Sequence, residues 1–85
     1  MTQRNAIKRL VLKALLKMDG TPLRESSVYD SIKIGISPTP TDGEIKVAVQ
    51  ELEADKFITG AADQLDGEIS WALTPKGTIR AQQLP

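Results

Sequence analysis

The sequence contains neither cysteine nor histidine, and these two absences exclude much of protein chemistry. Without cysteine there are no disulfides and no thiolate metal sites. Without histidine the chain lacks the commonest general base and the commonest metal ligand. Carboxylates are plentiful, but no pair is recognisable as an acid–base couple, and no glycine-rich phosphate loop occurs. We therefore expect a protein that is not an enzyme and that holds no metal and no cofactor.

Aromatic residues and long apolar runs are also scarce. The three aromatic side chains are Tyr29, Phe57 and Trp71, so the core must consist mostly of Leu, Ile, Val and Ala. The longest apolar-rich run, Leu10 to Met18, is interrupted by Lys13 and Lys17 and cannot span a bilayer. The residues after Arg4 form no signal peptide, because they contain no uninterrupted apolar segment with a cleavage site. The expected location is the cytoplasm.

The length of 85 residues predicts one domain over residues 1–85. The net charge is zero, but residues 1–40 hold seven basic and three acidic side chains, and residues 41–85 hold four basic and eight acidic ones. Proteins dedicated to nucleic acids are usually basic overall, so neutrality counts against that class. The opposite charges of the two halves instead favour association with a protein partner or with a second copy.

The first half of the chain predicts two helices. Apolar residues at three- and four-residue spacing indicate a helix from Thr2 to Met18, which Asp19-Gly20 ends. Leu12 and Leu16 fall outside its main stripe and are either peripheral core or a strip that meets a second copy or a partner helix. A short extended link follows, in which Leu23 is placed to pair with a later hairpin.

A second helix is expected from Glu25 to Lys33, with its buried side formed by Val28, Tyr29 and Ile32. Gly35 is expected to break this helix. The segment from Ile34 to Pro40 then reads as a loop, in which Pro38 and Pro40 keep the residues before them extended.

The clearest start signal in the chain lies at Thr41. Thr41 and Glu44 fit a capping box, in which each side chain satisfies a free backbone amide at the start of a helix. The helix is expected from Thr41 to Asp55. Its inward face is predicted to be Ile45, Ala48, Val49 and Leu52, and its outward residues Lys46, Val47, Gln50 and Glu51.

The last third predicts a hairpin and a closing helix. The strands are expected at Phe57–Ala62 and Ile69–Leu73, and Asp66-Gly67 is typical of a two-residue turn. That turn would set Ala62 opposite Trp71 and Gly60 opposite Leu73; a longer loop from Asp63 to Gly67 is the second choice and keeps the same faces. Thr74-Pro75 is typical of a helix start, and the residues expected to pack back onto the domain are Ile79, Ala81 and Leu84.

The order of these elements resembles that of a winged helix-turn-helix domain. ELEADKFI (residues 51–58) is similar to the end of the recognition helix and the start of the wing, and WALTPKG (71–77) to the second wing strand and the closing helix, of bacterial MarR- and PadR-type transcriptional regulators. The resemblance implies a mainly helical α+β fold: a three-helix core, a wing of two or three strands and a C-terminal helix. It also implies that residues 41–55 form the recognition helix and Asp63 to Glu68 the wing tip.

The function that the resemblance implies is insertion of the recognition helix in the major groove of double-stranded DNA, with the protein acting as a transcriptional regulator and a homodimer. The DNA-binding residues would be Lys33, Ser37, Thr39, Thr41, Gly43, Lys46, Val47 and Gln50. The acidic helix and wing favour an alternative, a winged-helix module that binds a protein partner and no DNA. Asp42 and Glu44 stand where a phosphate would approach the helix N-terminus, and the wing tip carries no Lys or Arg.

Overall fold

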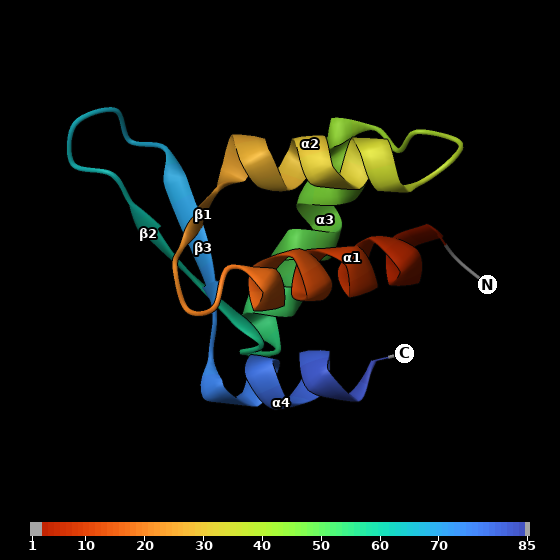
Figure 1. Ribbon diagram of the computed structural model, residues 1–85. Helices are drawn as coiled ribbons and strands as arrows, with labels where there is room; N and C mark the ends of the chain where they lie inside the picture. The colour runs from red at the N-terminus through yellow and green to blue at the C-terminus, as the bar shows by residue number, and fades with distance from the viewer. Residues whose placement is uncertain (1–2, 85) are drawn as a thin grey trace.

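A computed structural model describes residues 3–84 of the chain. Its elements follow in the order α1 (Gln3–Lys17), β1 (Leu23–Arg24), α2 (Glu25–Gly35), α3 (Asp42–Ala54), β2 (Ile58–Ala62), β3 (Ile69–Leu73) and α4 (Pro75–Gln83). Figure 1 shows α1 between α2 and α4, with the β2–β3 hairpin projecting to one side of the helices. The mainly helical α+β class predicted from the sequence is confirmed. The part of the first predicted helix that falls on Thr2 lies outside the described residues.

Helix α1 is the centre of the core, because it contacts α2, α3, α4 and β3. Ile7 and Val11 of α1 are fully buried, as are Val28 and Ile32 of α2 and Ile45 of α3. Leu12 is also buried, with 4% of its surface exposed, and Leu16 packs partly against the core. Of the two interpretations of these leucines, the peripheral-core one is therefore correct for Leu12. The four inward residues predicted for the third helix are all buried: Ile45, Ala48, Val49 and Leu52.

The C-terminal ends of α1 and α2 both depend on glycine. Asp19 and Gly20 have positive φ values of 50° and 88°, which confirms the left-handed end expected for α1. The expectation that Gly35 breaks α2 is wrong, because α2 continues to Gly35 as its last residue. A Cβ at residue 35 would lie 2.9 Å from Cδ1 of Leu10. Glycine therefore lets the last turn of α2 approach α1 closely.

The three strands form one antiparallel sheet in the order β1-β3-β2. Leu23 pairs with Trp71, which confirms the expected pairing of Leu23 with the hairpin. The register of the hairpin differs from the preferred prediction: Gly60 lies opposite Trp71 and Ala62 opposite Ile69. The two-residue Asp66-Gly67 turn is therefore wrong, and the longer loop, the second choice, is correct.

The physical reason is a set of local hydrogen bonds at the loop. One carboxylate oxygen of Asp63 accepts the backbone N–H groups of Leu65 (2.7 Å) and Asp66 (3.3 Å), and Gly67 closes the loop with a φ of 76°. The N–H of Asp63 donates to the carbonyl of Glu68 at 2.8 Å, just beyond Ala62 and Ile69, the last pair of the two strands. An Asx-type turn, which the residues 66 and 67 alone do not reveal, therefore shifts the register by two.

Helix α4 begins as predicted, with Thr74 as its cap and Pro75 in its first turn. The Thr74 Oγ1 accepts the N–H of Gly77 at 3.0 Å. Gly77 and Ala81 are buried and Leu84 is partly buried, which places residues four and three apart on one inward face. The prediction that Ile79 packs inward is wrong: it is 59% exposed. Two residues correspond to about 200° around a helix, so Ile79 lies opposite Gly77.

Candidate nucleic-acid interface

The outward face of α3 is the surface predicted to read DNA, and it is open. Gly43, Lys46, Val47 and Gln50 are all exposed, at spacings of three, four and seven residues that set them on one side of the helix. The opposite side carries the buried core residues of α3. Lys46 forms no ion pair with any residue of the described chain, so its ammonium group is available to a partner.

The capping box predicted at the start of α3 is present. The Thr41 Oγ1 accepts the N–H of Glu44 at 3.2 Å, and a carboxylate oxygen of Glu44 accepts the N–H of Thr41 at 3.0 Å. The Thr41 hydroxyl also donates to that oxygen at 3.2 Å. The hydroxyl of Thr41 and the carboxylate of Glu44 are therefore already engaged in hydrogen bonds with each other and with the backbone. Ser37 and Thr39, in the loop ahead of the helix, are exposed.

An ion pair joins α2 to the first turn of α3. The Nζ of Lys33 lies 2.6 Å from a carboxylate oxygen of Asp42, and both side chains are partly exposed. The acid that the sequence places against an approaching phosphate is thus neutralised by the nearest predicted DNA-binding cation. Lys33 is accordingly brought to the same end of α3 as Ser37, Thr39 and Thr41.

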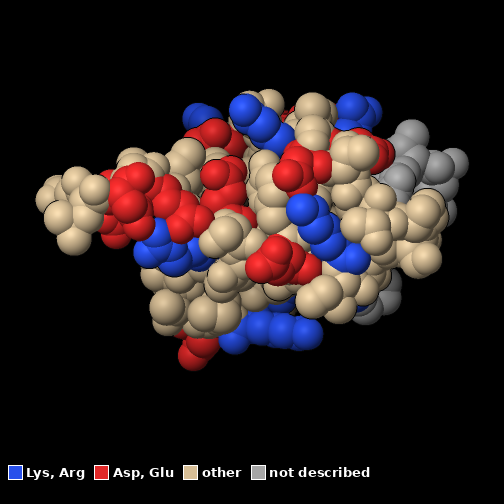
Figure 2. Space-filling view, turned by 90° about the horizontal axis from the view of Figure 1, so that it is seen from above, with Lys and Arg blue, Asp and Glu red and all other residues tan. Residues whose placement is uncertain are grey.

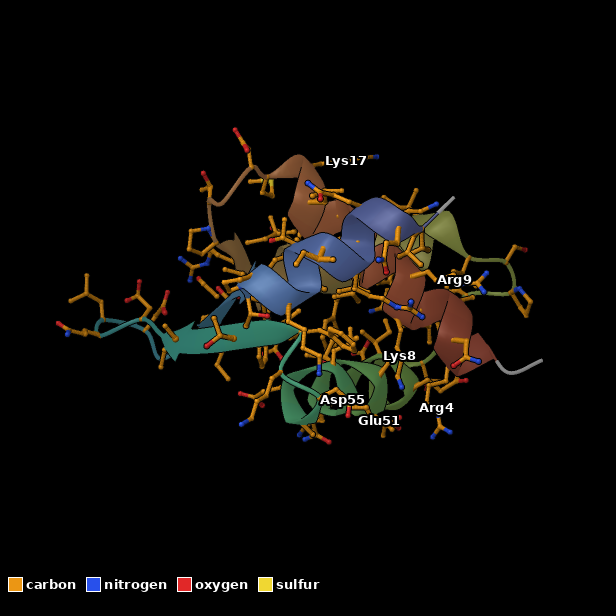
Figure 3. All side chains as sticks on the ribbon, turned by 90° about the horizontal axis from the view of Figure 1, so that it is seen from below. Arg4, Lys8, Arg9, Lys17, Glu51 and Asp55 are labelled. Carbon is orange, nitrogen blue, oxygen red and sulfur yellow. The ribbon has the colours of Figure 1, made fainter. Side chains whose placement is uncertain are left out.

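Glu51, further along α3, is neutralised from α1. The ammonium of Lys8 lies 2.8 Å from one of its carboxylate oxygens and the guanidinium of Arg4 lies 3.0 Å from the other. Figure 3 shows Arg4 and Lys8 pointing from α1 toward Glu51. The hydrogen bond from Lys8 is the largest cause of a lowered pKa at Glu51. Sequence reasoning missed this cluster; its only signal was the four-residue spacing of Arg4 and Lys8, which does not say where they point.

One arginine links the end of β1 to the wing. The Arg24 guanidinium, at the end of β1, forms ion pairs with both Asp66 and Glu68. These contacts and the surrounding hydrogen bonds lower the pKa of both carboxyl groups and raise the pKa of Arg24. Figure 2 shows the wing as a projection with red carboxylates along it, a blue cation beside them and a tan end. Between Asp63 and Glu68 there is no Lys or Arg to enter a minor groove.

Solved structures similar to this chain share its arrangement of elements. The circadian clock associated protein Pex from Anabaena aligns with a TM-score of 0.69 and 20% identity over 96% of this chain and 72% of its own. ZitR from Lactococcus lactis, a double mutant in apo form, aligns with a TM-score of 0.68 and 18% identity over 94% of this chain and 55% of its own. The chain has the winged-helix fold.

A second structure of the ZitR mutant gives the same result, with a TM-score of 0.66 and 19% identity over 91% of this chain. The winged-helix chain spans about half the length of the ZitR chains, 47% and 55%. No protein-family model and no curated protein sequence matches it. At these identities the likeness establishes the winged-helix fold. None of the helices in residues 3–84 has the length and apolar character needed to cross a membrane.

Proposed function

We propose that this protein binds double-stranded DNA through the exposed face of α3 and acts as a transcriptional regulator. The observation that carries the proposal is the face itself. It presents an unpaired ammonium at Lys46 and an amide at Gln50, one turn apart and both exposed. A glutamine pairs well with an adenine edge and a lysine with guanine or phosphate, and the major groove admits one helix.

The ion pairs around α3 support this function by reducing its negative charge. Asp42 is paired with Lys33, and Glu51 with Lys8 and Arg4. Glu44 is held in the capping box, where its carboxylate accepts backbone and hydroxyl hydrogen bonds. The face of α3 is therefore less repulsive to phosphate than its sequence indicates.

One copy has few phosphate contacts to offer. Lys46, Lys33, Ser37 and Thr39 lie on or beside the proposed interface, and the wing adds no cation at its tip. Tight binders make about six to ten phosphate contacts, so one copy with about four is expected to bind weakly. We infer that two copies act together on one DNA site.

The test is fluorescence anisotropy with a mixed-sequence DNA duplex at low and moderate salt. Binding is expected to weaken as salt rises, and Lys46→Ala and Gln50→Ala are each expected to weaken it by about tenfold, from the loss of one contact. Arg9→Ala is the matched control, because it removes one exposed cation from α1 and leaves α3 intact. If the duplex does not bind at low salt, or if Arg9→Ala weakens binding as much as Lys46→Ala, DNA reading by α3 is excluded.

A second candidate function is recognition of a protein partner without DNA. It is favoured by the wing, in which Leu65 is 98% exposed beside Asp63 and Asp66. An apolar side chain flanked by carboxylates is suited to a basic, apolar protein surface and not to a phosphate backbone. A protein that binds no duplex yet associates through Leu65 would have this second function.

A further inference from the structure

We propose that the wing tip of one copy docks into a groove between α1 and α2 of a second copy, with Leu65 as the inserted side chain. The proposal concerns association of the protein with itself and does not depend on DNA binding. It follows from two surfaces of the molecule that are complementary in shape and in charge.

The first surface is an apolar groove of about 400 Å³. Its lining comes from the second half of α1, the end of α2 and the start of β1, and its apolar side chains are Leu10, Ala14, Met18, Leu23 and Ile34. Ile34 is 87% exposed although it is a large hydrophobic residue. Gly35 sets the depth here, because its lack of a side chain is what allows α2 to pack on Leu10. The groove is large enough to hold a leucine side chain with room to adjust.

Two lysines stand at this groove. Lys13 and Lys17 are four residues apart on α1 and both line it. Neither forms an ion pair with any residue among those the structure describes. The groove is therefore an apolar trough beside two cations that form no ion pair within residues 3–84.

The second surface is the wing tip, which has the opposite character. Leu65 is 98% exposed and is held in place, because its N–H donates to the Asp63 carboxylate at 2.7 Å. Asp63 and Asp66 stand on either side of it along the chain, and Asp63 has no ion-pair partner among residues 3–84. The wing tip is thus an exposed leucine flanked along the chain by two carboxylates. Figure 2 shows a projection with a tan end next to red acidic side chains.

Charge complementarity selects a second copy as the occupant. The groove offers apolar side chains with two lysines, and the wing tip offers one apolar side chain with Asp63, which forms no ion pair in the described chain, and Asp66, which is paired with Arg24. Ile34 and Leu65 are also the two most exposed large hydrophobic residues of the described chain. Docking would cover Leu65, bring Ile34 against it and set Asp63, which has no ion-pair partner among residues 3–84, beside Lys13 and Lys17.

The contact joins two different patches, so its symmetry has a consequence. Two copies that exchange wings about a two-fold axis make the contact twice and close as a dimer. If the contact does not close in this way, each assembly keeps one unfilled groove and one undocked wing, and it can grow by adding further copies there. Either arrangement makes association depend on protein concentration and on both patches.

Analytical ultracentrifugation from micromolar to millimolar protein, without DNA, tests the proposal. The wild-type protein is expected to associate, and Leu65→Glu is expected to weaken association at least about tenfold, because it removes the apolar contact and adds repulsion. The double variant Lys13→Glu, Lys17→Glu is expected to do the same from the other patch. Ile79→Glu is the matched control: it places the same charge at another exposed hydrophobic residue, on α4, and should leave association unchanged. Thermal unfolding followed by circular dichroism confirms that each variant is folded.

Mixing the two defective proteins gives the sharpest result. The Leu65→Glu protein keeps an intact groove and the lysine variant keeps an intact wing, so one wing–groove contact can form between them. A mixture that associates while neither variant does so alone supports the proposal. A wild-type protein that stays monomeric throughout, or variants that associate as the wild type does, each overturn it.

Discussion

Gly77 packs directly against the carbonyl oxygen of Phe57: a Cβ built at residue 77 would lie 1.8 Å from that oxygen. The same oxygen accepts a hydrogen bond from the N–H of Thr74 at 3.0 Å, and the single proton of the Thr74 hydroxyl is shared between this oxygen at 3.1 Å and the carbonyl oxygen of Lys56 at 2.6 Å. The carbonyl is therefore fixed by the cap of α4 and cannot turn aside. This contact holds the start of α4 against the start of the hairpin.

Gly77→Ala is expected to lower the free energy of unfolding by about 3 kcal/mol or more, because backbone must move to admit the methyl group. The measurement is urea unfolding followed by the fluorescence of Trp71, the only tryptophan. Gly43→Ala serves as the comparison, since a Cβ there meets nothing closer than 3.9 Å. A Gly77→Ala protein as stable as the wild type would contradict this packing.

Gly43→Ala is expected to separate stability from function. It lies in the first turn of α3, is exposed and has room for a methyl group, so alanine should raise the free energy of unfolding by about 0.5–1 kcal/mol. If the proposed interface is right, the same methyl group stands between α3 and DNA and weakens duplex binding. Unfolding and anisotropy measured on one preparation test both effects, and a variant that is more stable with unchanged binding places Gly43 outside the interface.

The ion pairs of Arg24 with Asp66 and Glu68 should affect the pKa values of both carboxyl groups. The pKa of Asp66 is lowered chiefly by the N–H of Glu68 and then by Arg24, and that of Glu68 chiefly by Ser26 and then by Arg24. Because both folded-state pKa values lie below the unfolded ones, the stability they contribute is present above about pH 4.5, the upper of the two ordinary values. It is lost as the pH falls through the lowered values.

Arg24→Met is therefore expected to raise the pKa of Asp66 and of Glu68, and to leave both still below their ordinary values because the other hydrogen bonds remain. A carboxyl carbon NMR titration measures both groups directly. Arg80→Met, which removes an exposed cation from α4, should leave them unchanged. If the pKa values of Asp66 and Glu68 are the same in the Arg24 variant as in the wild type, the ion pairs of Arg24 do not form in solution.

The elements of this fold were predictable because each has a local cause. The capping box at Thr41, the Thr74-Pro75 start of α4 and the left-handed end at Gly20 depend on residues within four positions of each other. The hairpin was predicted with correct faces and a wrong register. The small residue opposite the indole was anticipated, but it is Gly60 and not Ala62, because the Asp63 carboxylate organises a longer loop.

The electrostatics of the candidate site were less predictable, since they depend on pairs distant in sequence. The sequence shows an acidic third helix and an acidic wing. Only the fold shows that Lys8 reaches Glu51, 43 positions away, and that Arg24 reaches Glu68, 44 positions away. The opposite charges of the two halves are thus partly matched within the molecule. The groove beside Lys13 and Lys17 likewise needs the packing of α2 on α1 and has no sequence motif.

Asp42→Asn tests how charge at the start of α3 controls DNA binding. Removing the carboxylate frees Lys33, its partner at 2.6 Å, and lessens the repulsion of phosphate near the helix N-terminus. Duplex affinity at low salt is expected to rise several-fold, with a slope of log K against log salt steeper by about one. The free energy of unfolding is expected to fall by about 1 kcal/mol or less, because an exposed ion pair and a favourable helix-dipole contact are weak.

Glu53→Gln is the control for net charge, because it removes an exposed carboxylate from the other end of the same helix. Equal gains in the two variants would mean that only the total charge matters. Lys33→Ala is expected to act in the opposite direction to Asp42→Asn, since it leaves Asp42 unpaired and removes a cation. If Asp42→Asn weakens duplex binding while Lys33→Ala leaves it unchanged, the start of α3 does not face phosphate, and the DNA-binding surface must lie elsewhere on the molecule.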